Sequence, residues 1–302
     1  MAPETHELDN VDVELPSGEV LAYEDLYSIA AAEKSVTVAL LGAAGSGKTT
    51  LITSLYQMFL QGTLEGKVSF SGSHTIQAFE KRAFYSRITS QGNEPVTPRT
   101  QLGSLNDLLH LRTYSTESRK YMNLLFTDSS GEEIQSLTGD IEAASNEFPI
   151  LREAKHICIV LDGDKLTKAR RKNAEIQSGI QLLKTFIDGK AIRNNAIISI
   201  VITKYDLLKR VDAFDEKSIA NQILDKFLDQ IPTLKSIPEV FYTAAMPSKA
   251  EGAEQGYGLN RLMLYFIEKP PVADPDNTRS SSIPNTCSQF DLWKDRIKYE
   301  EE

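Results

Sequence analysis

The chain has 302 residues, 41% of them apolar, which is enough to bury a sizeable hydrophobic core. Its formal net charge of −9 excludes the broad basic surface that non-specific binding of nucleic acid or anionic lipid requires. The acidic, polar N-terminus is unlike a secretory signal, and no apolar run approaches the length of a membrane span. We therefore expect a cytoplasmic protein with no integral membrane segment and no nucleic-acid partner.

Apolar, strand-like runs alternate with amphipathic stretches from residue 35 to residue 268, which we interpret as one domain. The predicted strands, in chain order, are Val36–Leu41, Leu108–Tyr114, Tyr121–Thr127, His156–Leu161, Ala196–Ile202 and Val240–Thr243. The second and third are joined by a short polar link, which predicts an antiparallel hairpin. The alternation predicts an α/β fold with a six-stranded, mostly parallel sheet, one antiparallel edge strand and helices on both faces.

Three segments depart from this alternation. Residues 1–34 form an N-terminal extension, which the sequence leaves open between a lead-in strand with a short helix and a loose arm. Residues 61–107 form an inserted segment, because a tight connection between the first helix and the second strand needs far fewer residues. Residues 269–302 are rich in proline and serine, and this composition predicts a mostly non-helical C-terminal tail.

A phosphate-binding pattern, G-x-x-x-x-G-K-S/T, follows the first predicted strand. Its residues are Gly42, Ala43, Ala44, Gly45, Ser46, Gly47, Lys48 and Thr49. Small residues let successive backbone N–H groups surround phosphate oxygens at the start of the following helix. We expect Lys48 to contact the β- and γ-phosphates, Thr49 to bind Mg²⁺, and Thr50 to lie beside them. The loop alone does not distinguish ATP from GTP.

A D-x-x-G pattern, running from Asp128 to Gly131, follows the third predicted strand. We expect Asp128 to hold Mg²⁺ through a water molecule and the Gly131 N–H to meet the γ-phosphate. On its own, this short pattern also fits an ordinary surface turn. Its place after a buried strand, downstream of the phosphate loop, favours the metal site.

A T-K-x-D pattern follows the fifth predicted strand and consists of Thr203, Lys204, Tyr205 and Asp206. The carboxylate of Asp206 can accept hydrogen bonds from guanine N1–H and N2–H₂, a pair of donors that adenine lacks. We expect the aliphatic stem of Lys204 to lie along the base. The last predicted strand ends at Thr243, and Ala244 and Ala245 follow it. The Ala244 N–H is expected to donate to guanine O6, so the set predicts GTP rather than ATP.

These four patterns, each at the end of a predicted strand, resemble those of a Ras-like P-loop GTPase of the translation-factor-related class over residues 35–268. Finer strings resemble the bacterial double-GTPase family: Phe70–Thr75, Ala78–Arg82, Pro95–Thr100 and Asp128–Glu132. Members of that family are single-domain proteins associated with multi-gene conflict or defence systems. The resemblance implies GTP and GDP as ligands, Mg²⁺ as the metal, GTP hydrolysis, and protein effectors or a second related GTPase as partners.

The resemblance also implies roles for residues near the phosphates. Thr97 or Thr100 is the implied switch threonine that completes the Mg²⁺ shell, and we prefer Thr100 because it is nearer to the second strand. Glu132 stands where many relatives carry a glutamine that orients the attacking water. Ala44 stands where many carry a glycine. Both departures predict slow intrinsic hydrolysis.

An arginine finger stabilises γ-phosphate charge in many enzymes of this class. Arg99 is the first candidate here, with Arg82 and Arg87 as alternatives, beside Lys48 and Glu132 as the other catalytic candidates. The simpler interpretation, an ordinary solvated arginine, is the favoured one for all three.

Slow hydrolysis favours a molecular switch whose surface at residues 92–107 and 128–140 is ordered by GTP. Two other functions stay open at this point. One is a GTP-dependent scaffold or assembly subunit with little turnover. The other is an ATP-using P-loop enzyme, in which Asp206 would lack its guanine partner.

Overall fold

The computed structural model describes residues 16–86, 97, 99–100, 103–211, 214–247 and 253–268. All of the described residues belong to one compact unit, which lies within Met1–Pro271. The predicted C-terminal tail, residues 269–302, lies outside the described residues, and so does Arg87. In the described parts of the chain, no helix combines the length and apolar character that crossing a membrane requires.

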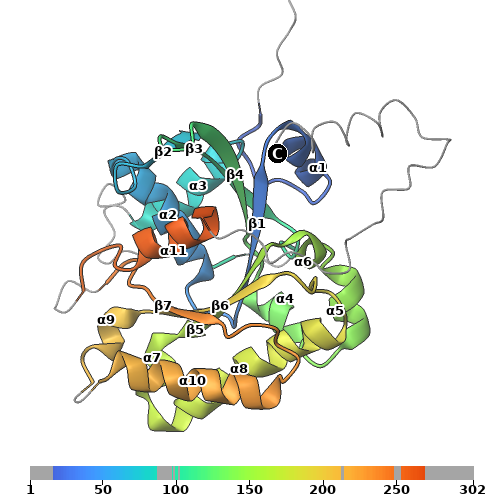
Figure 1. The fold of residues 1–302 in the computed structure, drawn as a ribbon, viewed down its shortest axis with the longest axis vertical. Helices are drawn as coiled ribbons and strands as arrows, with labels where there is room; N and C mark the ends of the chain where they lie inside the picture. Colours follow the sequence, from blue (N-terminus) through green and yellow to red (C-terminus); the bar gives the residue numbers. More distant parts are fainter. Residues whose placement is uncertain are drawn as a thin grey trace, which may run out of the picture. The chain divides into compact units, whose positions relative to one another are not determined.

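A seven-stranded sheet forms the centre of the fold, in the order β2-β3-β4-β1-β5-β6-β7 (Figure 1). The strands are β1 (Ser35–Leu41), β2 (Val68–Gly72), β3 (Leu108–Ser115), β4 (Lys120–Thr127), β5 (His156–Asp162), β6 (Ile197–Thr203) and β7 (Glu239–Tyr242). Pairing is parallel from β4 through β1, β5 and β6 to β7, whereas β3 runs antiparallel to both of its neighbours. The predicted α/β fold with a mostly parallel sheet is confirmed.

Two details of the predicted sheet are wrong. There are seven strands rather than six, because the inserted segment contributes β2. The antiparallel strand β3 is consequently second from the edge, and β2 forms the edge. The β2 sequence is Val-Ser-Phe-Ser-Gly, of which only Val68 is buried, so it lacks the continuous apolar run that marks the central strands. It pairs with β3 through an irregularity in register between Phe70 and Gly72.

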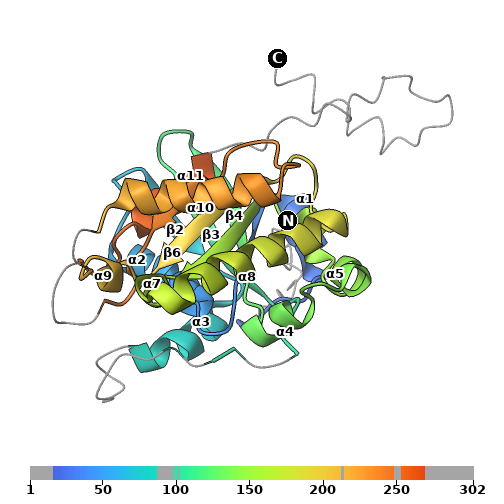
Figure 2. The same ribbon diagram turned by 90° about the horizontal axis from the view of Figure 1, so that it is seen from below.

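Helices cover both faces of the sheet, as predicted (Figures 1 and 2). The residues of β1 alternate between the faces: Val38 and Leu40 pack on one side, and Ala39 and Leu41 on the other. The first side is covered by α2 (Lys48–Gln61), α3 (Ile76–Ala83) and α11 (Leu259–Glu268). The second side is covered by α1 (Asp25–Ala32), α4 (Gly131–Ser136), α5 (Ile141–Glu147), α6 (Ile150–Glu153), α8 (Ala169–Asp188) and α10 (Glu216–Gln230).

The short elements η1 (Phe84–Ser86), α7 (Gly163–Thr167) and α9 (Tyr205–Leu208) complete the described structure. Of the N-terminal extension, the described part is a docked helix rather than a loose arm. Leu26 and Ile29 of α1 are buried in the core. Ahead of α1, the backbone of Leu21 exchanges two hydrogen bonds with Leu108 of β3, at 3.0 and 2.9 Å.

The inserted segment is also packed against the domain. Phe79 of α3 is fully buried, and its ring stacks on Tyr56 of α2 at 4.6 Å between centroids. The Tyr56 hydroxyl donates to Glu80, the residue that follows Phe79 in α3, at 2.7 Å. These contacts fix α3 on α2, the helix that begins at the phosphate loop.

A buried histidine links the inserted segment to the sheet. His110 of β3 accepts a hydrogen bond at Nδ1 from the amide of His74, at 3.0 Å. Its Nε2 lies 3.0 Å from Oδ1 of Asn123 in β4, an oxygen that only accepts, so the ring is neutral with its hydrogen on Nε2. Burial lowers the pKa of His110 to about 4. Protonation of Nδ1 would break the bond from His74.

This histidine should make the fold sensitive to acid. The unfolded chain takes up the proton near pH 6.5, whereas the folded chain resists it down to about pH 4, so stability is lost as the pH falls through this window. Between pH 7 and 4.5, we expect the wild type to lose about 2 kcal/mol of unfolding free energy more than His110→Gln, which does not titrate. Urea unfolding at both pH values measures this. An equal loss in the two proteins would contradict the assignment.

Candidate functional site

The predicted site residues lie together at the carboxyl ends of the central strands, because the strands that carry them are parallel. The loops after β1, β4, β5, β6 and β7 all leave the sheet at the carboxyl ends of their strands. In open α/β sheets this end is where ligands bind. The patterns identified in the sequence are therefore brought together by strand pairing, although they are spread over about two hundred residues of chain.

The loop between β1 and α2 has the geometry of a phosphate cradle. Gly45 and Gly47 have φ angles of 74° and 91°, a left-handed region that favours glycine. Gly47 directly precedes the first turn of α2. The ammonium of Lys48 reaches back over the loop and donates to the carbonyls of Gly42 at 2.8 Å and Ala43 at 3.3 Å. Burial lowers the pKa of Lys48 to about 8, against the opposing effect of nearby carboxylates.

A cavity of about 220 Å³ opens beside this loop. Every residue that lines it belongs to the set predicted from the sequence: Ala44, Gly45, Gly47, Lys48, Thr49, Thr50, Thr97, Arg99, Thr100, Gly131, Glu132 and Lys204. The phosphate loop, Gly131 of the D-x-x-G pattern and the two candidate switch threonines thus line one cavity.

Three of the oxygen-bearing side chains predicted as metal ligands converge at the edge of this cavity. Thr49 Oγ1 lies 2.6 Å from Thr100 Oγ1 and donates to Asp128 Oδ1 at 2.8 Å. Thr97 is placed differently, since its hydroxyl accepts from Thr50 at 3.0 Å. Mg²⁺ prefers oxygen ligands and keeps water and phosphate in its shell. Two hydroxyls and one carboxylate fit such an ion, and of the two threonines it is Thr100 that meets Thr49.

The D-x-x-G segment packs directly on the phosphate loop. A Cβ atom at Gly131 would lie 2.4 Å from the amide nitrogen of Ala44, which is far inside contact distance. Only glycine allows the two backbones to approach so closely. The main chains of the loops after β4 and β1 are therefore in direct contact at Gly131.

Two of the candidate arginines, Arg82 and Arg99, lie in the described part of the chain and are paired with carboxylates. Arg82 of α3 donates from Nε to Asp128 Oδ2 at 2.5 Å, where Asp128 is completely buried. Arg99 lies 3.3 Å from Glu132, and 82% of its side chain is exposed. Glu132 also accepts from the Ser130 hydroxyl at 3.2 Å. Arg82 contacts the predicted metal site, whereas Arg99 stays at the mouth of the cavity.

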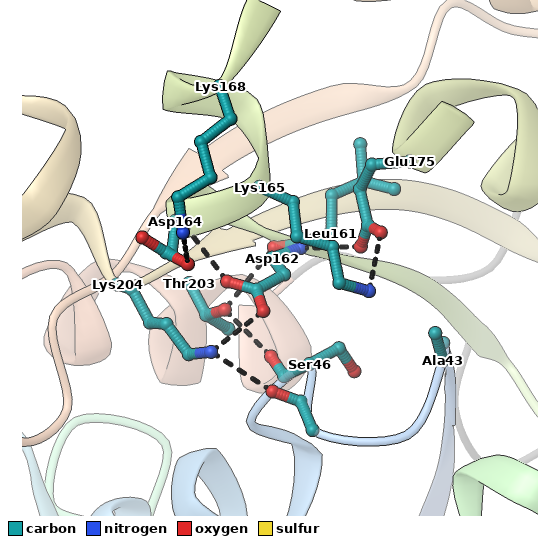
Figure 3. A network of polar contacts seen from close by, with 12 residues as sticks. Ala43, Ser46, Leu161, Asp162, Asp164, Lys165, Lys168, Glu175, Thr203 and Lys204 are labelled. Atoms are coloured by element: carbon teal, nitrogen blue, oxygen red, sulfur yellow. Dashed lines mark hydrogen bonds and ion pairs between the residues drawn. The ribbon is translucent and has the colours of Figure 1, made fainter. Parts of the chain in front are cut away.

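The T-K-x-D residues are tied to the phosphate loop (Figure 3). The Thr203 hydroxyl donates to the carbonyl of Ser46 at 2.7 Å. Lys204 has a left-handed backbone, with φ 52°, and its ammonium donates to the carbonyl of Gly45 at 3.1 Å. Asp206 is buried in α9. The residues expected to recognise the base are thus positioned by the same loop that is expected to hold the phosphates.

Asp162 is a member of the site that sequence reasoning missed. It ends β5, accepts from the Lys204 ammonium at 2.7 Å, and caps α7 by accepting from the amide of Asp164 at 3.0 Å (Figure 3). Its own amide donates to Glu175 at 2.9 Å, and Glu175 pairs with Lys165 at 2.8 Å. The available signal was an acidic residue directly after a buried strand, as at Asp128.

The segment after β7 is held by backbone contacts. The amide of Ala244, for which we predict a bond to guanine O6, donates here to the carbonyl of Tyr257 at 3.1 Å. This bond forms because the chain at Tyr257 folds back and forms a β-bridge with Ala244. The Thr243 carbonyl accepts from the amide of Tyr205 at 3.0 Å, so this segment still supports the T-K-x-D loop. Ala245 follows directly and is half-buried.

The chain was compared with known families, curated proteins and solved structures. A family model described as Double-GTPase 2 matches residues 36–266. Among solved structures, the chain is similar to a bacterial selenocysteine-specific elongation factor, EF-Sec, with 16% sequence identity and a TM-score of 0.35. That match covers 76% of this chain and 28% of the elongation factor. No curated protein matches the chain.

Asp162→Asn should weaken nucleotide binding, because the Lys204 ammonium loses the charged partner that positions it. We expect the dissociation constant to rise about fivefold. Titration with a fluorescent nucleotide measures this. Asp164→Asn is the matched control, since Asp164 pairs with the exposed Lys168 at 2.5 Å instead. Equal effects of the two substitutions would show that Asp162 does not act through Lys204.

Proposed function

The chain belongs to the Double-GTPase 2 family, and on this premise we propose that it hydrolyses GTP slowly to GDP and phosphate as a nucleotide-dependent switch. Membership makes it a GTP-binding P-loop protein. The observation that carries the finer proposal is the convergence of Thr49, Thr100 and Asp128 beside the phosphate loop. This arrangement supports a site that senses the γ-phosphate together with Mg²⁺.

We infer the following roles at the phosphate end. The amides of residues 42–48 hold the phosphate oxygens, and Lys48 contributes the positive charge. Thr49 and Thr100 supply hydroxyl oxygens to Mg²⁺, and Asp128 binds it through water. The metal ion would neutralise charge on the phosphates. Thr100, rather than Thr97, is our candidate switch threonine, supported by its 2.6 Å contact with Thr49.

At the base end, we infer that Asp206 selects guanine through its carboxylate and that the Lys204 stem lies against the ring. Thr203 joins this segment to the phosphate loop through its bond to Ser46. ATP would place an acceptor, adenine N1, where Asp206 needs a donor. The alternative of an ATP-using enzyme is therefore disfavoured.

The proposal of slow turnover rests on Glu132. At this position a carboxylate adds negative charge near the γ-phosphate, where a glutamine amide would orient the water without charge. Glu132 lines the cavity and is held there by Ser130 and Arg99. Arg99 stays the candidate arginine finger, since this residue lines the same cavity. Ala44, which also lines the cavity, is the second departure that supports slow hydrolysis.

The output of the switch is proposed to be the binding of protein effectors or of a second GTPase in a bacterial conflict or defence system, in the cytoplasm. The surface expected to change is 92–107 and 128–140, and much of the first part lies outside the described residues. A scaffold with little turnover is the second candidate, which Glu132 also favours. Measured turnover separates the two.

Asp206→Asn should abolish the preference for GTP over ATP, because an amide offers one acceptor and one donor where guanine presents two donors. We expect GTP affinity to fall at least about 100-fold while ATP affinity changes little. Competition of GTP and ATP against a labelled nucleotide measures both. Asp225→Asn, at an exposed position of α10, is the matched control. A wild type that binds both nucleotides equally would contradict GTP recognition.

Glu132→Gln should raise the single-turnover rate of GTP cleavage about tenfold, because the substitution removes a negative charge and restores an amide near the attacking water. The exposed Glu142→Gln serves as control. Phosphate release from pre-bound GTP, started with Mg²⁺, gives the rate. A wild type that is already fast and unaffected by the substitution would refute slow turnover, whereas no cleavage in either protein would favour the scaffold.

A further inference from the structure

The carboxylate of Asp128 is already paired with a positively charged side chain, that of Arg82. Its Oδ2 accepts from Arg82 Nε at 2.5 Å, and its Oδ1 accepts from the Thr49 hydroxyl at 2.8 Å. The Asp128 side chain is fully buried, and 80% of the Arg82 side chain is shielded from solvent. Arg82 thus forms a hydrogen bond to one carboxylate oxygen of Asp128, the residue that we propose as a metal ligand.

A buried carboxylate needs such a partner. An uncompensated charge in the interior is strongly unfavourable, and the neighbourhood of Asp128 is acidic. Burial raises the pKa of Asp107, and the carboxylates of Asp128 and Glu133 raise it further, while Arg82 alone among these neighbours lowers it. Lys48 also attracts Asp128, but its ammonium donates to loop carbonyls. Arg82 is therefore the cation in direct contact with Asp128.

The guanidinium is held in place by the inserted segment. Arg82 donates from Nη1 to the carbonyl of Ala78, one turn earlier in α3, at 3.2 Å. Helix α3 is fixed on α2 by the stacked rings of Phe79 and Tyr56 and by the bond from Tyr56 to Glu80. The guanidinium beside Asp128 is thus held in place by a packed helix.

We propose that Arg82 is a resident counter-charge of Asp128 in the nucleotide-free protein, against which Mg²⁺ must compete. Two cations at one carboxylate repel each other, so Arg82 stabilises the empty site and weakens the binding of Mg²⁺ with GTP. The inserted segment thereby sets the Mg²⁺ concentration at which the switch loads. This inference rests on the proposed Mg²⁺–GTP site.

The test compares Arg82→Gln with the wild type in two measurements. The first is the Mg²⁺ concentration that gives half-maximal binding of a non-hydrolysable, fluorescent GTP analogue. We expect it to fall about tenfold in Arg82→Gln, because the competing charge is gone. The second is the melting temperature of the nucleotide-free protein in EDTA, which should fall by several degrees.

Two further variants separate charge from packing. Lys81→Gln removes the same charge from the neighbouring position of α3, where Lys81 is exposed and pairs with Glu19, and should change neither measurement. Arg82→Lys keeps the charge and should stay within about twofold of the wild-type Mg²⁺ midpoint. If Arg82→Gln is too unstable to purify empty, it is loaded with Mg²⁺ and the analogue and titrated with EDTA. The Mg²⁺ midpoint is then obtained from the free Mg²⁺ concentration at which half of the fluorescent analogue has been released.

The outcomes are distinct. An Mg²⁺ midpoint in Arg82→Gln that is unchanged or higher than in the wild type overturns the proposal, as does an unchanged melting temperature of the empty protein. A wild type that shows no Mg²⁺-dependent binding of the GTP analogue means that the proposed function fails instead. The melting comparison then still decides whether Arg82 is the counter-charge of Asp128.

Discussion

The parallel pairing of β1 with both β4 and β5 is the constraint on which the site depends. Because all three strands point the same way, the phosphate loop after β1 emerges between Asp128 on one side and Asp162 on the other. The strands are buried on both faces, so a one-residue slip in register would exchange the side chains that pack in the two core clusters. The absence of a Cβ at Gly131 then lets the loop after β4 rest on the main chain of Ala44.

Three positively charged side chains lie near the carboxyl ends of the parallel strands, and each donates to an oxygen atom of the protein. Lys48 is held by the carbonyl of Gly42, Arg82 by the carboxylate of Asp128, and Lys204 by Asp162. Fixed charges of this kind need little reorganisation when an anionic ligand arrives. These three side chains come from α2, from α3 and from the residue that follows β6. The positive charge at the site therefore depends on the correct packing of all three elements.

Much of the fold was predictable because the central strands are continuous apolar runs. The predicted Val36–Leu41 and His156–Leu161 each differ from β1 and β5 by one residue at an end. The edge strand β2 was missed because it buries only Val68, which leaves little periodic signal. Contacts that depend on distant packing were also out of reach. The pairing of Arg82 with Asp128 requires α3 to dock on α2, and the bond from Ala244 to Tyr257 requires a loop to fold back.

The two ends of the sheet restrict how another protein can approach. The edge strands are short, with five residues in β2 and four in β7, and the register of β2 is irregular at Phe70. Short and irregular edges are poor templates for adding a strand from another chain. Recognition by backbone pairing is therefore disfavoured, and a binding partner has to distinguish this protein through the side chains of its helices and loops.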